Sequence, residues 1–487
     1  MKIAFFCIPA HGHTNPTLGV VRELIARGHE VWYYSYELMR AKIESTGAHF
    51  VPCDAYDPQM TLSEEDGARI GKDLAFSTRL IVELTLALDD AIVADMKRLQ
   101  PDVIVADSMA FWGKLIAGKL GVPFVSSTTT FAFNKESARV MQQSPKSLFS
   151  MLLSLPKINK SLRPLREKGY AVKSVLDIIQ NDNDTDTVVY TSPEFQPCAE
   201  SFSDHYAFVG PILRGAEQPL ETSEQPTVYI SLGTVDNRHP DFYRSCLAAL
   251  ADRPCRAILS AGESTDIAAL GQIPANCTVA PRVDQMAVLS VCDAFLTHCG
   301  MNSASEALFY GVPLILFPQT PEQHGVANRA AELGAGVFLE SGDSAAIRAA
   351  VDTVLHDGAY RAAAQRIAES FRRCGGAKAA ADKIESVAND PVRPTAHHPV
   401  MTAVQLAQAV VGTIALALLI AAVFTHGSAR LTLLLLGAVL GWPIPTVLHI
   451  LRRIFLRYSV AVVISPSTHL RNMSVSLRRS LAIRIIA

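Results

Sequence analysis

Residues 294–323 read AFLTHCGMNSASEALFYGVPLILFPQTPEQ, and this stretch carries more chemistry per residue than any other part of the chain. Its first residues, 294–297, form a short apolar run that predicts a buried strand. Residues 304–310 have the composition of a helix, with Asn302 or Ser303 as its N-cap. Because the strand turns through a glycine into a helix N-terminus, several backbone N–H groups and the positive end of the helix dipole point at one place. The stretch therefore predicts an anion site.

The polar side chains of this turn suit a phosphate group. His298, Asn302 and Ser303 can each donate a hydrogen bond to an anion. Gly300 lets the backbone approach the anion closely. Glu306 can accept from a sugar diol, as an acidic residue does in other nucleotide-binding folds. We therefore expect a nucleotide at this turn.

A second apolar run, residues 313–317, leads to an acidic residue and an amide side by side, Glu322 and Gln323. This pair suits a hexose, whose hydroxyls both donate and accept hydrogen bonds. Together the two segments predict a site for a nucleotide sugar.

The pattern HCGxNSxxEALxxGVPxxxxPxxxEQxxxANR, residues 298–329, resembles the donor-binding signature of UDP-glycosyltransferases of the GT-B fold. In particular it is similar to the macrolide-type glycosyltransferases of bacteria, in glycosyltransferase family 1. The resemblance implies an α/β protein of two doubly wound Rossmann-like domains that face each other across a cleft. The domains expected are 1–214, binding the acceptor; 215–225, a linker; 226–390, binding the UDP-sugar; and 391–487, a membrane hairpin and basic tail.

Apolar runs that predict strands alternate with helical segments in both halves of the chain, which favours doubly wound parallel sheets. Ligands of such sheets bind beyond the carboxyl ends of the strands. The predicted strands cover residues 3–8, 31–35, 103–106, 122–126, 188–192, 228–232, 257–260, 277–280 and 294–297. Two helices, near residues 359–373 and 377–387, are expected to end this part of the chain.

Two residues are the candidates for acid–base chemistry. In the family, the histidine of a G-H-x-x-P loop takes the proton of the acceptor, and residues 12–16, GHTNP, match that loop. The resemblance therefore implies that His13 is the base. Asp107 is its expected partner, which would orient the imidazole and stabilise its cation. The alternatives are a structural histidine and an N-cap role for Asp107.

Inverting glycosyl transfer also requires stabilisation of the departing diphosphate. We expect His298, Asn302, Ser303 and the helix N-terminus to supply it, with Gly233 and Thr234 as helpers from a facing loop. Residues 182–186 have a D-x-D spacing but lack the glycine and glutamate of a calcium loop, so we interpret them as a solvated turn. The sequence thus predicts no metal and no cofactor, with the UDP-sugar as co-substrate.

The nucleobase site departs from the family pattern at one position. Relatives often carry an aromatic residue where this chain has Arg282. A guanidinium plane can stack on uracil, and Gln285 can meet the edge of the base. Uridine is the expected base, while the identity of the sugar stays open.

Composition separates the chain into an acidic body and a basic tail. After Asp390 there are nine arginines and no Asp, Glu or Lys, so residues 1–390 carry a formal charge of −11. An acidic body does not favour nucleic acid as a partner. The nine cysteines are scattered without a C-x-x-C pair, which indicates a reducing compartment. The first residues predict a strand and not a signal peptide.

Two uncharged stretches in the tail, residues 400–425 and 431–451, are about as long as a membrane span of roughly 20 residues. We expect a two-span hairpin, with Pro443 and Pro445 kinking the second span. The downstream arginines place the C-terminus, and with it the catalytic domains, on the cytoplasmic side. A pair of buried helices is the alternative.

The main hypothesis is an inverting, UDP-sugar-dependent O-glycosyltransferase that transfers a hexose to a small lipophilic acceptor. Two alternatives stay open: a nucleotide-sugar epimerase of the same fold, and a non-catalytic, membrane-anchored partner that binds nucleotide sugar. The loop around His13 argues against the epimerase, which needs no acceptor. The non-catalytic partner predicts a missing base or donor residue, and none is missing.

Overall fold

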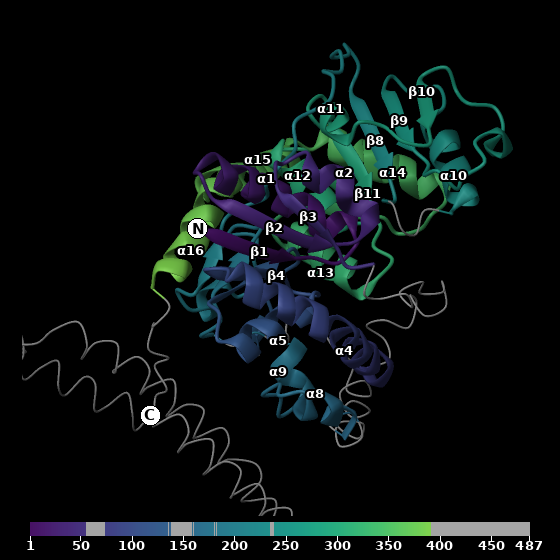
Figure 1. The fold of residues 1–487 in the computed structure, drawn as a ribbon. Helices are drawn as coiled ribbons and strands as arrows, with labels where there is room; N and C mark the ends of the chain where they lie inside the picture. Colours follow the sequence, from purple (N-terminus) through teal and green to yellow (C-terminus); the bar gives the residue numbers. More distant parts are fainter. Residues whose placement is uncertain are drawn as a thin grey trace, which may run out of the picture. The chain divides into compact units, whose positions relative to one another are not determined.

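Two parallel β-sheets organise the chain, as seen in a computed structural model (Figure 1). The structure describes residues 1–54, 74–134, 136–137, 158, 160–179, 181, 183–233 and 238–390. The expected alternation of strands and helices is confirmed in both halves.

The N-terminal sheet has seven strands in the order β3-β2-β1-β4-β5-β6-β7, and neighbouring strands pair in parallel. Its strands are β1 (Lys2–Phe6), β2 (Glu30–Ser35), β3 (His49–Pro52), β4 (Val103–Asp107), β5 (Phe124–Thr128), β6 (Thr187–Val189) and β7 (Tyr206–Phe208). The central strands read as short continuous apolar runs because helices cover both faces of a parallel sheet.

The C-terminal sheet has six parallel strands in the order β10-β9-β8-β11-β12-β13. Its strands are β8 (Thr227–Ser231), β9 (Arg256–Ser260), β10 (Cys277–Ala280), β11 (Ala294–Thr297), β12 (Leu314–Leu316) and β13 (Gly336–Phe338). In both sheets the strand order reverses beside the first strand, between β1 and β4 and between β8 and β11. Ligands of doubly wound sheets bind at such reversal points, beyond the carboxyl ends of the strands.

Helices connect the strands of each sheet. In the N-terminal part they are α1 (His11–Ala26), α2 (Arg40–Glu44), α4 (Leu74–Leu99), α5 (Phe111–Leu120), α8 (Arg163–Glu167) and α9 (Val175–Ile179). In the C-terminal part they are α10 (Pro240–Leu250), α11 (Gln285–Leu289), α12 (Met301–Phe309), α13 (Pro321–Glu332), α14 (Ser344–His356), α15 (Gly358–Arg373) and α16 (Gly376–Asn389).

Two helices begin earlier than the sequence predicts. Helix α1 begins at His11, so His13 lies in the first turn of a helix and not in a preceding loop. Helix α12 begins at Met301 with Gly300 as its N-cap, so Asn302 and Ser303 are not the N-cap but lie in the first turn. The N-cap thus lies two residues before Asn302, and Cys299, which precedes it, adopts the left-handed conformation with φ at 66°.

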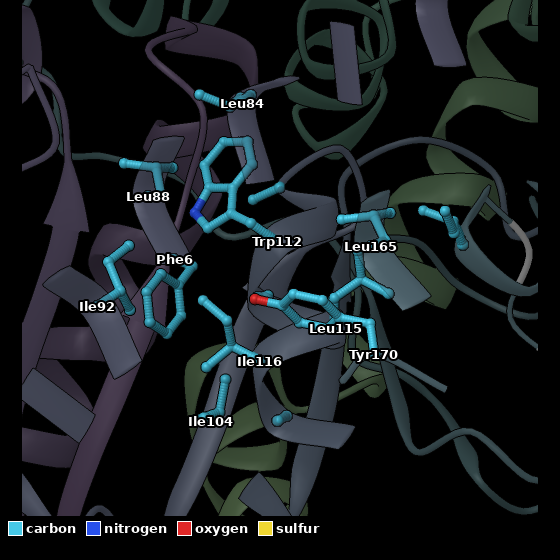
Figure 2. Close-up of a cluster of buried hydrophobic side chains, with 14 of the residues drawn as sticks. Phe6, Leu84, Leu88, Ile92, Ile104, Trp112, Leu115, Ile116, Leu165 and Tyr170 are labelled. Carbon is cyan, nitrogen blue, oxygen red and sulfur yellow. The ribbon is translucent and has the colours of Figure 1, made fainter. Parts of the chain in front are cut away.

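A large apolar cluster fixes α4 and α5 on the N-terminal sheet (Figure 2). Phe6 of β1 and Trp112 of α5 lie among aliphatic side chains of the two helices, including Leu88 and Ile116. All four residues are at most 2% exposed. Burial on this scale holds the ends of β1 and β4, which carry the candidate site, in one position relative to each other.

The last described helix returns to the first sheet. Helix α16 packs against α1, where Arg27 binds Asp382 and Glu385 at 2.6 Å and 2.9 Å. Ala380 and Ile384 of α16 are buried in the same apolar cluster as β1. The C-terminal part of the chain is thereby tied to the N-terminal sheet.

The prediction of a membrane protein with two spans is wrong. Of the residues that the structure describes, no helix combines the length and the apolar character that a bilayer crossing needs. The predicted spans, 400–425 and 431–451, lie outside the described residues, and apolar composition alone was the argument for them. The membrane assignment, and the cytoplasmic orientation derived from it, are therefore not carried further.

Candidate functional site

The ends of β1 and β4 bring His13 and Asp107 together. Asp107 is the last residue of β4, and its Oδ2 lies 2.7 Å from Nδ1 of His13, in the first turn of α1. The Asp107 side chain is fully buried, whereas that of His13 is 19% exposed. The other carboxylate oxygen accepts from the backbone N–H of Met109 at 2.9 Å. The carboxylate is thus held in place, and no residue that the structure describes is hydrogen-bonded to Nε2 of the imidazole.

The environment of His13 favours its protonated form. Burial by itself lowers the pKa of His13, but the charge and hydrogen bond of Asp107 outweigh it, with a further contribution from Glu322. The pKa of His13 is therefore raised above its usual 6.5. An imidazole with a raised pKa is a stronger base, which is the property that proton removal from a hydroxyl needs.

The first turn of α1 contacts the first turn of α12. Nδ2 of Asn302 donates a hydrogen bond to the backbone oxygen of Gly12 at 2.7 Å. In an unbroken helix that oxygen would accept from the N–H of residue 16, but Pro16 has none. Asn302 therefore satisfies a carbonyl that the proline leaves without its helical partner. The contact sets the predicted phosphate turn beside His13.

His298 sits between two glycines. A Cβ on Gly233 or on Gly300 would lie 2.6 Å from Nε2 of the His298 ring, so a larger residue at either position would displace the ring. Gly233 follows β8 and His298 follows β11, the two strands at the reversal point of the C-terminal sheet. Burial lowers the pKa of His298 to about 4, so the ring is neutral at pH 7 and can offer a hydrogen bond rather than a charge.

Three of the predicted nucleotide-binding residues form one network. Nε2 of Gln285 donates to Oε2 of Glu306 and to Oγ of Ser303, the latter at 3.4 Å. The hydroxyl of Tyr229 donates to Oε1 of Gln285 at 3.1 Å. Burial raises the pKa of Glu306, although the bond from Gln285 and the charge of Arg214 oppose the rise. The network holds the Glu306 carboxylate, an acceptor suited to a ribose diol, in a defined position.

The two residues predicted to bind the sugar lie at the start of α13. Oε1 of Gln323 accepts from the backbone N–H groups of Gln319 and Thr320 at 2.8 Å and 3.1 Å, as part of a capping box. Its amide oxygen is therefore engaged in the helix cap. Desolvation raises the pKa of Glu322, in the first turn of the same helix, and the charge of His13 opposes that rise. His13 and Glu322 thus act on each other across the two halves of the chain.

The remaining predicted positions are less informative. Arg282 is exposed and follows β10. Thr234 lies outside the described residues. The structure adds Thr129, whose Oγ1 lies 3.1 Å from Nδ1 of His13 and which is 3% exposed. It directly follows β5, and its position just after a strand end is the only sequence signal for it.

The site can therefore combine two functions. One side holds the imidazole–carboxylate pair of His13 and Asp107. The other side holds the N-terminus of α12, a helix of nine residues, with hydrogen-bond donors around it.

Residues 246–375 match the family described as erythromycin biosynthesis protein CIII-like, C-terminal domain. The uncharacterised UDP-glucosyltransferase YdhE of Bacillus subtilis is 31% identical over 389 residues, which cover 78% of this chain and 96% of the relative. The chain belongs to the macrolide-type glycosyltransferases of the GT-B fold.

Further comparisons agree with this glycosyltransferase assignment. Demethyllactenocin mycarosyltransferase of Streptomyces fradiae is 33% identical over 402 residues, which cover 79% of the chain and 86% of the relative. The solved structure of CalG4, the calicheamicin glycosyltransferase, matches with a TM-score of 0.66 and 29% identity, covering 81% of the chain and 99% of CalG4. The glycosyltransferase is thus an enzyme, as predicted. Neither alternative, epimerase or non-catalytic partner, finds support among these relatives.

Proposed function

We propose that this glycosyltransferase is an inverting, UDP-sugar-dependent O-glycosyltransferase that transfers a hexose to the hydroxyl of a small lipophilic acceptor. The observation that carries the proposal is the 2.7 Å contact between Nδ1 of His13 and Oδ2 of Asp107. Gly12, the residue before His13, accepts a hydrogen bond from Asn302. The base and the helix N-terminus that would bind the diphosphate then lie next to each other, as a displacement at a sugar carbon requires.

In the proposed step, Nε2 of His13 takes the proton of the acceptor hydroxyl as its oxygen attacks C1 of the sugar. The bond between C1 and the diphosphate oxygen breaks, and its electron pair leaves with UDP. Attack from the face opposite the leaving group inverts the configuration at C1. Asp107 stabilises the imidazolium that forms, as the buried aspartate of a hydrolase triad does.

The charge that develops on UDP needs stabilisation by fixed dipoles. We assign this role to the N-terminus of α12, with Asn302, Ser303 and the neutral ring of His298 as hydrogen-bond donors. Gln285 and Glu306 would hold the nucleoside, and Glu322 and Gln323 the hexose. No metal is required in this proposal, because donors and a helix dipole neutralise the diphosphate.

The names of relatives support a small organic acceptor. They include oleandomycin glycosyltransferase of Streptomyces antibioticus, 28% identical, and zeaxanthin glucosyltransferase of Pantoea ananas, 25% identical. These names are the support for the class of acceptor proposed.

The test is UDP release from UDP-glucose with a phenolic acceptor, in EDTA, for the wild type and for His13→Ala. We expect turnover in EDTA and a loss of about a hundredfold or more without the imidazole. Turnover that stops in EDTA would overturn the metal-free assignment, and full turnover in His13→Ala would overturn the assignment of the base. The anomeric configuration of the product, measured by NMR, tests inversion.

A further inference from the structure

The imidazole of His13 has a second polar neighbour besides Asp107. Oγ1 of Thr129 lies 3.1 Å from Nδ1 of His13, the same ring nitrogen that lies 2.7 Å from Oδ2 of Asp107. Thr129 directly follows β5 and is 3% exposed. Nδ1 is therefore within hydrogen-bond distance of two oxygen atoms, which come from the ends of two neighbouring strands, β4 and β5.

The chemistry of these three groups decides which atom donates. An ionised carboxylate only accepts hydrogen bonds, so the close contact with Asp107 requires a proton on Nδ1 of His13. This N–H is then the donor, and Oγ1 of Thr129 is its second acceptor. In the neutral ring Nε2 carries no proton, as the proposed base requires.

Hydrogen bonds of the sheet hold the chain in place just before Thr129. In the strand register Ser127 lies opposite Asp107, and the backbone N–H of Ser108 donates to its carbonyl oxygen at 2.9 Å. The N–H of Tyr190, which follows β6, donates to the carbonyl oxygen of Thr128 at 3.3 Å. The carboxylate and the hydroxyl that face Nδ1 are thus fixed by one set of strand pairings.

The chain is also anchored just after Thr129. The ring of Phe131 packs on that of Phe195, with 5.5 Å between their centroids. The side-chain amide of Gln196 bonds both the N–H and the carbonyl oxygen of Ala132, at 2.9 Å and 3.0 Å. A β-branched side chain such as that of Thr129 has in addition few χ1 rotamers. Its hydroxyl is therefore a fixed point against which a neighbouring ring can be oriented.

We propose that Thr129 is a positioning residue that holds the plane of the His13 imidazole, so that Nε2 faces the acceptor hydroxyl. The bond to Asp107 fixes the distance of Nδ1 but leaves the ring free to tilt about that bond, and a second acceptor restricts the tilt. The inference rests on the proposed function and deepens it, because it adds a third group to the proposed base. Loss of the hydroxyl should lower kcat and leave the KM for the donor nearly unchanged, because orientation of the base affects the chemical step.

The experiment compares Thr129→Val with Thr129→Ser in the full-length protein, by UDP release from UDP-glucose with a phenolic acceptor. Valine keeps the branched Cβ and removes the hydroxyl, whereas serine keeps the hydroxyl. We expect kcat to fall about tenfold in Thr129→Val and to stay within about threefold of the wild type in Thr129→Ser.

Two further variants control for effects on folding. Thr353→Val makes the same change at an exposed position of α14 and should keep the wild-type kcat. Thermal melts show whether each variant is folded. Thr129→Ala also removes the hydroxyl, and it replaces Thr129→Val in the comparison if the valine variant does not fold.

The pH profile separates an effect on orientation from an effect on charge. Nδ1 of His13 carries its proton in both the neutral and the protonated ring, so the bond to Thr129 is present in both. The kcat/KM of Thr129→Val should therefore fall by a similar factor at every pH, with its acidic limb in place. A limb that moves as far as in Asp107→Asn would show that Thr129 acts on the pKa of the base, which overturns the positioning role.

A double variant tests whether Thr129 acts through His13. In His13→Ala there is no ring to orient, so the addition of Thr129→Val should cause no further loss. If Thr129→Val lowers kcat by the same factor in both backgrounds, Thr129 acts on something other than the imidazole, and the inference is overturned. A raised KM for UDP-glucose with an unchanged kcat overturns it too, because it indicates a contact with the donor.

The remaining outcomes separate this inference from the proposed function. If Thr129→Val keeps the wild-type kcat while His13→Ala loses it, the positioning role is overturned and the proposed function stands. A wild type that releases no UDP from UDP-glucose and the acceptor overturns both.

Discussion

Asn302 donates a hydrogen bond of 2.7 Å to the carbonyl oxygen of Gly12, a residue 290 positions earlier in the chain. The carbonyl oxygen can accept this bond because Pro16, its usual partner one helical turn later, has no backbone N–H to donate. The bond joins the helix that carries His13 to the helix that carries the phosphate turn.

Asn302→Ala should therefore reduce both stability and activity. The carbonyl of Gly12 loses its partner, and we expect a loss of about 1 kcal/mol in the free energy of unfolding. A loss of about tenfold or more in kcat/KM should accompany it, because the anion site loses a donor. Denaturant titration and steady-state kinetics measure the two effects.

Pro16→Ala added to Asn302→Ala supplies a backbone N–H to the same carbonyl. The double variant should recover part of the stability and none of the activity. Additive changes in stability, with no recovery, would contradict the role assigned to this carbonyl.

Asp107→Asn should shift the pH profile of the glycosyltransferase to lower pH. The base must be neutral to accept a proton, so kcat/KM falls below the pKa of His13, which Asp107 holds above 6.5. Without the carboxylate, burial lowers that pKa and the acidic limb moves to lower pH. The rate at pH 8 should fall by about a hundredfold or more. An unmoved acidic limb would show that another group sets it.

Gly300→Ala should displace the ring of His298. The added Cβ would lie 2.6 Å from Nε2 of His298, and we expect a loss of about 1–3 kcal/mol in stability, as for other overpacked sites. The KM for the donor should rise, because the displaced ring no longer faces the phosphate turn. Gly358→Ala is the matched control, since a Cβ there meets nothing within 4 Å. A Gly300→Ala protein as stable and active as Gly358→Ala would refute the packing argument.

His298 should make the protein less stable in mild acid. Its folded pKa of about 4 lies below the usual 6.5, so the unfolded chain binds the proton more readily between these values. The contribution of His298 to the free energy of unfolding has its full value above pH 6.5. It is lost as the pH falls towards 4, by at most about 3 kcal/mol. His298→Asn should lose less stability over the same range in thermal melts. An identical slope in both proteins would contradict the lowered pKa.

The sequence alone predicted the architecture well, because strands and helices follow from short-range patterns. The predicted bounds of β10 and β11 match the structure, and α15 and α16 lie within one or two residues of their predicted ends. The meeting of His13 and Asp107 was also predictable, since parallel strands end at the same edge and β1 pairs with β4. The sequence also carried the donor signature by which the family was recognised.

Tertiary structure alone decided which groups touch across the two sheets. The bond from Asn302 to Gly12 joins residues 290 positions apart, one from the part of the chain around each sheet. No local pattern encodes such contacts, because hydrophobic period and turn preferences act over a few residues, whereas these distances depend on how two complete sheets pack.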